Sequence, residues 1–356
     1  MAIQGAIMKE KYKAVIIGAG PSGLAAAINL KNSGTDDILV IDKAKFPRYK
    51  CCAGYITAKT AKEYLKLGLD IKECNYMLIK DFHIYYRLKK YQTIVNKFLY
   101  TNRYIDRTEL DYGFFKTAQS RGIEISEQLT AKELDRDNKA LLLSNGNSIS
   151  YDCLIFADGA SSSGGKYNPL KKRNIALQAI FKADIPDGID IHFGITKKGY
   201  AWVSRYDGLI NIGITDIYNP KLNYNQILKN FISSLGLECD DSNITGAFTP
   251  IGLVKPFIDG SIYYVGDAAG ACDPFTLSGL RYGLKSGKSC ARAVSGNNPE
   301  LYKKFMVSLK LRFFIMRLMQ AVFYIPFVQF LFFNIGCRLL KPLISFAFNN
   351  FFVGEK

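Results

Sequence analysis

A glycine-rich turn between two apolar runs, near the start of the chain, constrains the fold more than any other feature. Residues 12–18, YKAVIIG, form the kind of apolar run that is typical of a buried parallel strand, and GAGPSG occupies residues 18–23. LAAAINLKNSG then has helical character and closes on Gly34, and a second apolar run, DILVID, ends at Asp42. This order predicts a strand–helix–strand unit whose turn binds the phosphates of a dinucleotide.

Each residue of this turn has its own physical role. Gly18 permits the tight turn, Gly20 lets the backbone approach a pyrophosphate, and Gly23 lets the helix pack against the strand. The start of the helix offers unpaired N–H groups and the positive end of its dipole to the phosphates. Asp42 is expected to accept hydrogen bonds from a ribose. Because FAD and NAD domains both begin in this way, the motif does not choose between them.

A second turn of small residues lies late in the chain and favours a flavin. Residues 261–266, SIYYVG, predict a strand, and Gly266 and Asp267 stand at its end, ahead of a helix predicted from about residue 278. An acid at a strand end can hold a second ribose or a ribityl hydroxyl while the backbone approaches the cofactor. Small residues and a helix start suit the electron-rich end of a reduced flavin.

Five motifs in this order resemble known FAD-dependent enzymes. GAGPSG, FADGASS at 156–162 and VGDAAG at 265–270 resemble the fingerprints of the para-hydroxybenzoate hydroxylase type. FPRYKCCAG at 46–54 is similar to the FPR-x-K-x-C-G-G segment of the geranylgeranyl reductase family within that group. GYAWV at 199–203 is similar to the Tyr-x-Trp motif that lines the substrate cavity of that family. The resemblance covers about residues 10–295 and implies reduction of carbon–carbon double bonds in a polyprenyl lipid or quinone by hydride transfer from reduced FAD.

The resemblance also implies roles for individual residues. It assigns Cys52 to a catalytic position facing the flavin, and Tyr200 and Trp202 to the wall of a lipid tunnel. The chain departs from the family at Ala53 and Leu277, where the family has glycines. The cofactor contacts it implies are Gly18, Gly20, Gly23, Asp42, Arg48, Arg107, Asp158, Gly159, Gly266, Asp267 and Gly279.

Two roles remain open for Cys52. An isolated alkene has no carbonyl to stabilise developing charge, so the protein must supply a proton, positioning and a dry cavity. A thiol on a basic loop can serve in that proton path, or it can be a small, soft residue that packs against the ring. Cys51 fills a position where the family has proline, and we interpret it as incidental.

The expected fold class is α/β with three parts. A discontinuous Rossmann-type FAD-binding domain comprises residues 8–80, 101–165 and 259–300. An inserted mixed β-sheet substrate domain comprises residues 81–100 and 166–258, and a C-terminal helical region comprises residues 301–356. Eight scattered cysteines indicate a reducing cytoplasm, and with two histidines and no C-x-x-C pair we expect no metal site.

The C-terminal region combines apolar character with positive charge. The chain has a net charge of +16, which calls for an anionic partner, and no motif for nucleic acid is present. Beyond residue 300 the basic residues face a single acid, Glu355, and 20 uncharged residues separate Arg317 from Arg338. Three alternatives remain for this segment: a membrane span, an interfacial helical region, or ordinary core helices. We expect a cytoplasmic protein peripheral to the membrane.

Other functions also remain open. The same fold serves FAD-dependent monooxygenases and hydroxylases, and a flavoprotein with mainly a lipid-binding or regulatory role is a further alternative. The electron donor is expected to be NAD(P)H or a small redox protein, because no second GxGxxG motif marks a resident nicotinamide site.

Overall fold

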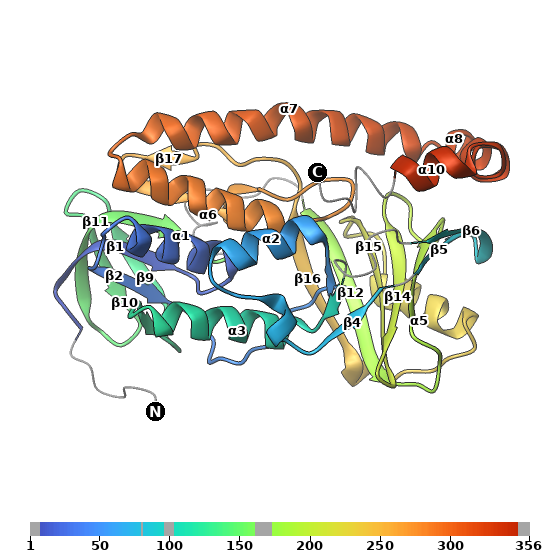
Figure 1. Cartoon of the computed structure of the whole chain (residues 1–356), viewed down its shortest axis with the longest axis horizontal. Coiled ribbons are helices and arrows are strands. Elements are labelled where there is room, and N and C mark those ends of the chain that lie inside the picture. The colour runs from blue at the N-terminus through green and yellow to red at the C-terminus, as the bar shows by residue number, and fades with distance from the viewer. Residues whose placement is uncertain (1–7, 80, 96–102, 161–172, 348–356) are drawn as a thin grey trace.

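Two sheets stand side by side beneath one long helix (Figure 1). The computed structural model describes residues 8–79, 81–95, 103–160 and 173–347. The expected α/β class is confirmed, because parallel strands alternate with helices in one part and a mixed sheet forms the other.

The first sheet has a parallel centre in the order β17-β18-β11-β1-β2-β8, and β10 and β9 extend it from β11. Its central strand β1 is buried from Ala14 to Ile17 because it lies between β2 and β11 in the middle of the sheet. The strands are β1 (Lys11–Ile17), β2 (Ile38–Ile41), β8 (Glu124–Ser126), β9 (Ala131–Asp135), β10 (Ala140–Leu143), β11 (Ser148–Phe156), β17 (Ile258–Asp259) and β18 (Ile262–Tyr264). A separate small sheet has the order β3 (Tyr55–Ile56), β7 (Arg103–Ile105) and β4 (Tyr76–Leu78).

A layer of helices packs beside the parallel strands. Helix α1 contacts both α3 and α6, and α6 also contacts α2. These helices are α1 (Pro21–Asn32), α2 (Ala58–Lys66), α3 (Arg107–Ser120) and α6 (Leu280–Ser295). The approach of α1 to α6 is very close: a Cβ atom on Gly287 would lie 2.2 Å from the carbonyl oxygen of Ser22.

The second sheet is mixed, in the order β16-β12-β15-β14-β13-β5-β6. Strand β5 runs parallel to β13, and the other pairs are antiparallel. Helix α5 (Tyr224–Ser234) covers one face and packs its apolar residues on β12 and β15. The strands are β5 (Asp81–Tyr86), β6 (Lys89–Val95), β12 (Arg173–Lys182), β13 (Gly188–Phe193), β14 (Tyr200–Tyr206), β15 (Leu209–Ile217) and β16 (Ile244–Pro250).

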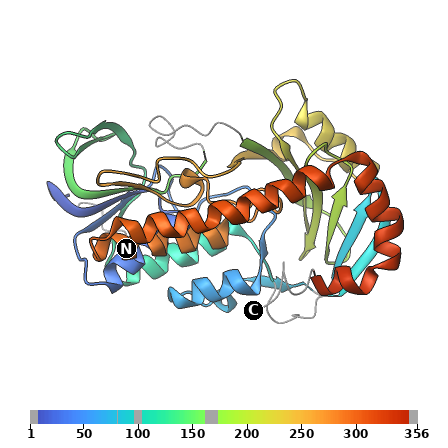
Figure 2. The ribbon, with the colours of Figure 1, turned by 90° about the horizontal axis from the view of Figure 1, so that it is seen from above.

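The C-terminal helices join the two parts. Helix α7 (Pro299–Phe323) runs along α6 and continues to the second sheet (Figure 2). After it come α8 (Pro326–Leu331), a π-helical segment (Phe332–Gly336), α9 (Cys337–Leu339) and α10 (Lys341–Ala347). Within the described ranges no single helix has the length and apolar character to cross a membrane, although α7 and Pro326–Gly336 pass together as a pair bent by 81°.

We predict that Gly287→Ala lowers the free energy of unfolding by about 1–3 kcal/mol, because the new methyl group meets backbone that cannot move aside. Gly283→Ala, one turn earlier on α6, is the matched control: its Cβ would lie 3.6 Å from the Cβ of Ser22, an ordinary contact. Thermal unfolding of both variants should show a lowered Tm for the first alone. Equal melting temperatures would contradict the tight α1–α6 contact.

Candidate active site

The glycine turn folds as the sequence predicts, and each glycine meets a different neighbour. Gly18 has φ +109°, and a Cβ there would lie 2.6 Å from the carbonyl oxygen of Ala157. A Cβ on Gly23 would lie 2.0 Å from the carbonyl oxygen of Gly18. Gly20 differs, because its Cβ would meet only Arg48 Nη2, at 3.6 Å. The space above Gly20 therefore suits a pyrophosphate, whereas Gly18 and Gly23 are needed by the fold itself.

Asp42 follows β2 and braces this turn. Its Oδ2 accepts a hydrogen bond from the N–H of Ala19 at 2.8 Å, and its Oδ1 accepts one from the N–H of Ala44 at 2.8 Å. A carboxylate oxygen has further acceptor capacity, so the same side chain can still receive ribose hydroxyls. The bracing role was not foreseen from the sequence.

A buried carboxylate pairs with two of the predicted cofactor residues. Asp111, which is 1% exposed, accepts hydrogen bonds from Arg107 Nε at 2.9 Å and Nη2 at 2.8 Å, and its Oδ2 also lies 3.3 Å from Arg48 Nη2. Burial acts to lower the pKa of Arg107, but Asp111 and other neighbours outweigh it and raise the pKa, so the guanidinium stays charged. Two cations on one carboxylate leave a net positive charge beside Gly20. Asp111 was missed, although its i,i+4 spacing from Arg107 on α3 is a recognisable signal.

The other two fingerprints end at the same edge of the sheet as the glycine turn. Asp158 and Gly159 follow β11, and the Cα of Asp158 would lie 2.9 Å from a Cβ on Gly18. Gly266 has φ +60° after β18, and a Cβ there would lie 2.5 Å from Ser22 Oγ. Because parallel strands end together, three segments far apart in the sequence meet where a cofactor is expected.

Asp267 lies against the start of α6. A Cβ on Gly279 would be 3.2 Å from Asp267 Oδ1. Burial raises the pKa of Asp267, while Lys50 and Arg107 act to lower it. An acid that is half-buried at a strand end, with cations nearby, suits a hydrogen-bonding role toward hydroxyl groups of a ligand.

Leu277 stands where the family has glycine, and its backbone adopts the conformation that glycine favours. Its φ is +58°, and its N–H donates to the carbonyl of Asp273 at 2.9 Å. The carboxylate of Asp273 also accepts from the N–H groups of Phe275 and Thr276, at 3.0 Å each. The turn therefore keeps its shape through Asp273 and holds Leu277 in a left-handed conformation at a cost of about 1–2 kcal/mol.

The loop that contains Cys52 is fixed to the second sheet. The N–H of Cys52 donates to Gln178 Oε1 at 3.0 Å, and its carbonyl accepts from Asn211 Nδ2 at 3.1 Å. Asn211 also accepts from Trp202 Nε1 at 3.0 Å. Gln178 and Asn211 were not singled out from the sequence, since each contacts a residue more than 120 positions away.

Tyr200 and Trp202 connect this loop to the last fingerprint. Their rings lie 6.4 Å apart on β14, and the Tyr200 hydroxyl donates to the carbonyl of Thr276 at 2.9 Å. Trp202 lies over Gly213, where a Cβ would be 2.1 Å from its ring. The structure therefore brings the Cys52 loop, the Tyr-x-Trp strand and the 273–279 turn together between the two sheets.

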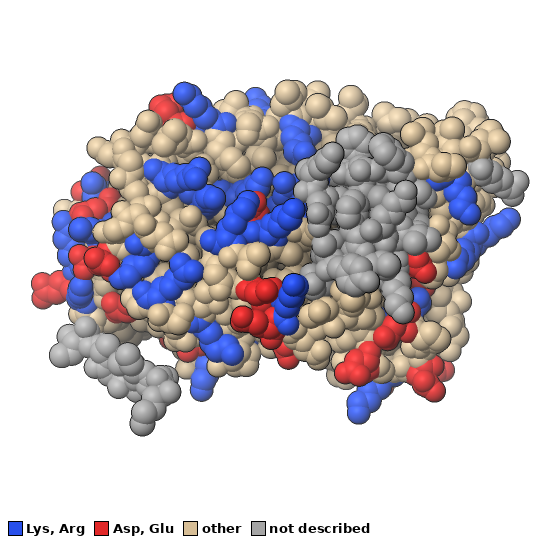
Figure 3. Space-filling model, in the orientation of Figure 1, with Lys and Arg blue, Asp and Glu red and all other residues tan. Residues whose placement is uncertain are grey.

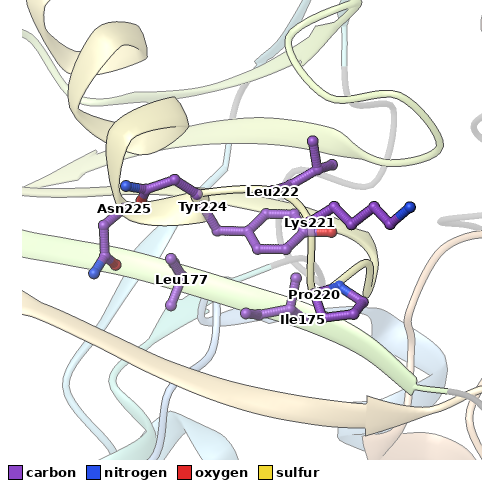
Figure 4. Close-up of a pocket in the computed structure, with 8 residues that line it drawn as sticks. Ile175, Leu177, Pro220, Lys221, Leu222, Tyr224 and Asn225 are labelled. Carbon is purple, nitrogen blue, oxygen red and sulfur yellow. The ribbon is translucent and has the colours of Figure 1, made fainter.

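A cavity of about 500 Å³ lies elsewhere, on the α5 side of the second sheet (Figure 4). Side chains alternate along β12, so Leu177 faces this cavity while Gln178 faces Cys52 on the other side. The cavity is open and holds none of the predicted site residues. It is lined by Ile175, Leu177, Pro220, Lys221, Leu222, Asn223, Tyr224 and Asn225.

Several known proteins are similar to this chain in sequence. The sequence model of the pyridine nucleotide-disulphide oxidoreductase family matches residues 12–164. A menaquinone reductase of Mycolicibacterium smegmatis is 25% identical over 81% of this chain and 77% of its own length. A digeranylgeranylglycerophospholipid reductase of Thermoplasma acidophilum is 24% identical over 85% of this chain and 84% of its own length.

The fold is shared with a solved structure described as a geranylgeranyl bacteriochlorophyll reductase-like protein of Thermoplasma acidophilum. The TM-score is 0.81 at 20% sequence identity, covering 96% of this chain and 97% of the other. These matches define the class of protein: the chain is an FAD-dependent oxidoreductase. The resemblance to the geranylgeranyl reductase family is confirmed by these relatives.

We predict that Gly20→Ala folds normally but binds FAD at least about tenfold more weakly. Gly20 has φ −75° and ψ 175°, which alanine adopts without strain. The added methyl group would therefore occupy the space proposed for the pyrophosphate without disturbing the fold. Gly23→Ala is the control, and it should lower the stability of the protein, because its Cβ would meet the carbonyl of Gly18. Flavin absorbance per protein and the Tm of the FAD-stripped proteins separate the two effects. Full flavin occupancy in Gly20→Ala would refute the assignment.

Proposed function

We propose that this enzyme reduces carbon–carbon double bonds in the polyprenyl chain of a membrane lipid or quinone. The observation that carries this proposal is the convergence of the Cys52 loop, Tyr200 and Trp202 beside the 273–279 turn. One relative is named as a reductase of a digeranylgeranyl lipid and another as a reductase of menaquinone, which supports a substrate of this class.

Cys52, Tyr200 and Trp202 would each have a role in the proposed reaction. Bound FAD, once reduced by NAD(P)H or a small redox protein, supplies the hydride for one alkene carbon. Cys52 would deliver the proton to the other carbon, and its Sγ is oriented by the N–H of Gly54 at 3.4 Å. Burial, with a smaller contribution from Cys52, raises the pKa of the Cys51 thiol to about 12, so Cys51 remains protonated. Tyr200 and Trp202 would hold an apolar chain and exclude water.

The cofactor side is supported by the chemistry of the donor set. Gly20 leaves room for a pyrophosphate, and the cationic pair Arg48 and Arg107 keeps a net positive charge beside it. Asp42 retains acceptor capacity for a ribose, and Asp267 stands at the other end for hydroxyl groups of the ribityl chain.

The proposed location is the cytoplasmic surface of a membrane. Most of the large apolar side chains exposed on the described surface lie on the C-terminal helices. On α7, Leu311 is 66% exposed, Phe314 65% and Leu318 57%, while Met306, Leu309 and Phe313 on its other side are buried. A helix that is apolar on both sides needs a second apolar environment, and a bilayer interface provides one.

The reaction is tested without oxygen. We expect that enzyme reduced chemically, then mixed with a geranylgeranyl-bearing lipid or with menaquinone, is reoxidised as the product gains two hydrogens per turnover, measured by flavin absorbance and mass spectrometry. Cys52→Ala should slow reoxidation by roughly a hundredfold if it donates the proton. Cys51→Ala is the matched control and should be near wild type.

Other outcomes would replace the proposal. Reoxidation only after oxygen is admitted, with an oxygenated product, would indicate a monooxygenase. A bound flavin that no donor reduces and that no lipid or quinone reoxidises would favour a lipid-binding or regulatory role. A Cys52→Ala variant with normal rates would leave that residue as a pocket wall.

The membrane location yields a separate prediction. Leu311→Glu with Leu318→Glu should lower the bound fraction in a vesicle flotation assay by about tenfold or more, because two carboxylates cannot enter the apolar part of the interface. Gln119→Glu with Gln226→Glu adds the same charge on exposed polar sites of α3 and α5, and should bind as wild type. Equal binding by all three proteins would refute the role of α7.

A further inference from the structure

Four basic side chains gather on the outer surface where α2, α6 and α7 meet. Lys59 belongs to α2, Arg281 and Lys285 to α6, and Arg312 to α7. Figure 3 shows blue side chains concentrated over α2 and α6 with little red among them. Among the described residues, none of these four has a carboxylate within ion-pair distance. Glu63, the acid whose charge acts on Lys285, is paired with Lys66 at 3.2 Å. We name this group the α2–α6–α7 cluster.

The cluster is electrostatically unfavourable as it stands. Burial lowers the pKa of Lys59, and Arg281, Arg312 and Lys285 lower it further. Burial also lowers the pKa of Lys285, and the positive charge of Arg281 lowers it further. Like charges that approach one another in a partly desolvated place destabilise the fold unless an anion joins them.

Arg281 supplies a second and independent observation, which is an unsatisfied donor. Its Nε is shielded from solvent and has no hydrogen-bond partner among the described residues. Leaving a guanidinium N–H in this state is costly. Arg281 also lies in the first turn of the 16-residue helix α6, where the helix dipole disfavours a cation.

The surroundings indicate what kind of anion fits. Arg312 lies over the ring of Tyr282, at 5.8 Å, and it is flanked on α7 by the exposed Leu311 and followed by Phe314 and Ile315. A cationic cluster that borders an apolar stripe is complementary to a molecule with a phosphate head and hydrocarbon chains. A soluble dinucleotide or an acidic protein would use the cluster but leave the stripe uncovered.

We propose that the α2–α6–α7 cluster binds the phosphate head group of an anionic phospholipid while the adjoining stripe of α7 enters the acyl region. The site fixes which face of the enzyme meets the membrane. Arg281 follows Gly279 by two positions, so the head group would be held next to the turn that carries the last flavin fingerprint. The inference rests on the proposed membrane location, and it does not depend on the reaction.

The test uses the full-length holoenzyme and vesicles of phosphatidylcholine with or without phosphatidylglycerol. Wild type should bind the anionic vesicles about tenfold more tightly, and Lys59→Gln with Lys285→Gln should lose most of this preference while still binding neutral vesicles. Lys132→Gln with Lys182→Gln removes the same charge from exposed sites on β9 and β12, and should keep the preference. Without lipid, the cluster variant should be no less stable than wild type, because repulsion has been removed.

Each other outcome overturns the proposal in a distinct way. Equal loss in both double variants would mean that only net charge matters. Unchanged anionic preference in the cluster variant would exclude the site. Unchanged vesicle binding together with slower reduction by an acidic ferredoxin would assign the cluster to a protein donor. Stabilisation of wild type alone by inorganic phosphate, with no effect on vesicles, would assign it to a soluble phosphate compound. Since no substrate is present in the flotation assay, failure of the proposed reaction would not affect it.

Discussion

The close approach of backbone segments around Ser22 is the constraint on which the rest of the structure depends. A Cβ on Gly23, Gly266 or Gly287 would meet the Gly18 carbonyl, the Ser22 hydroxyl or the Ser22 carbonyl, at 2.0, 2.5 and 2.2 Å respectively. Three segments can therefore meet at one point only because they lack side chains there. The amino end of α1, the end of β18 and the middle of α6 are thereby locked together. The strand ends that hold the fingerprints are positioned by this contact.

Electrostatics then give the locked region its chemical character. Asp111 is buried with Arg107 and Arg48, and one carboxylate between two guanidinium groups leaves positive charge facing the glycine turn. Removing Asp111 would leave buried cations uncompensated, at a cost of about 3–5 kcal/mol. The same ion-pair network that holds α3 against the 46–54 loop would therefore also serve to attract a pyrophosphate.

The sequence predicted the local parts of this enzyme better than the distant contacts. The first strand–helix–strand unit and the α/β class followed from apolar runs and glycine spacing, because those patterns reflect neighbours in the chain. The fixing of the Cys52 loop by Gln178 and Asn211 joins residues 126 and 159 positions apart, and no local pattern encodes it. Leu277 illustrates a different limit. The substitution was visible, but its φ of +58° depends on Asp273 and on a turn that only the structure shows.

The same limit explains why the C-terminal region allowed several interpretations. Its composition fits a membrane span, an interfacial helix or core helices. In the structure, α7 buries one side on α6 and exposes the other. At its end, the ring of Phe323 lies 5.3 Å from Phe193 of the second sheet and 5.7 Å from Phe275 of the last flavin turn. One helix therefore contacts the 273–279 turn and the second sheet, and its outer side is exposed. Whatever binds its outer stripe therefore binds an element that also packs against the candidate site, and under the proposed function this packing would help to exclude water from an apolar chain.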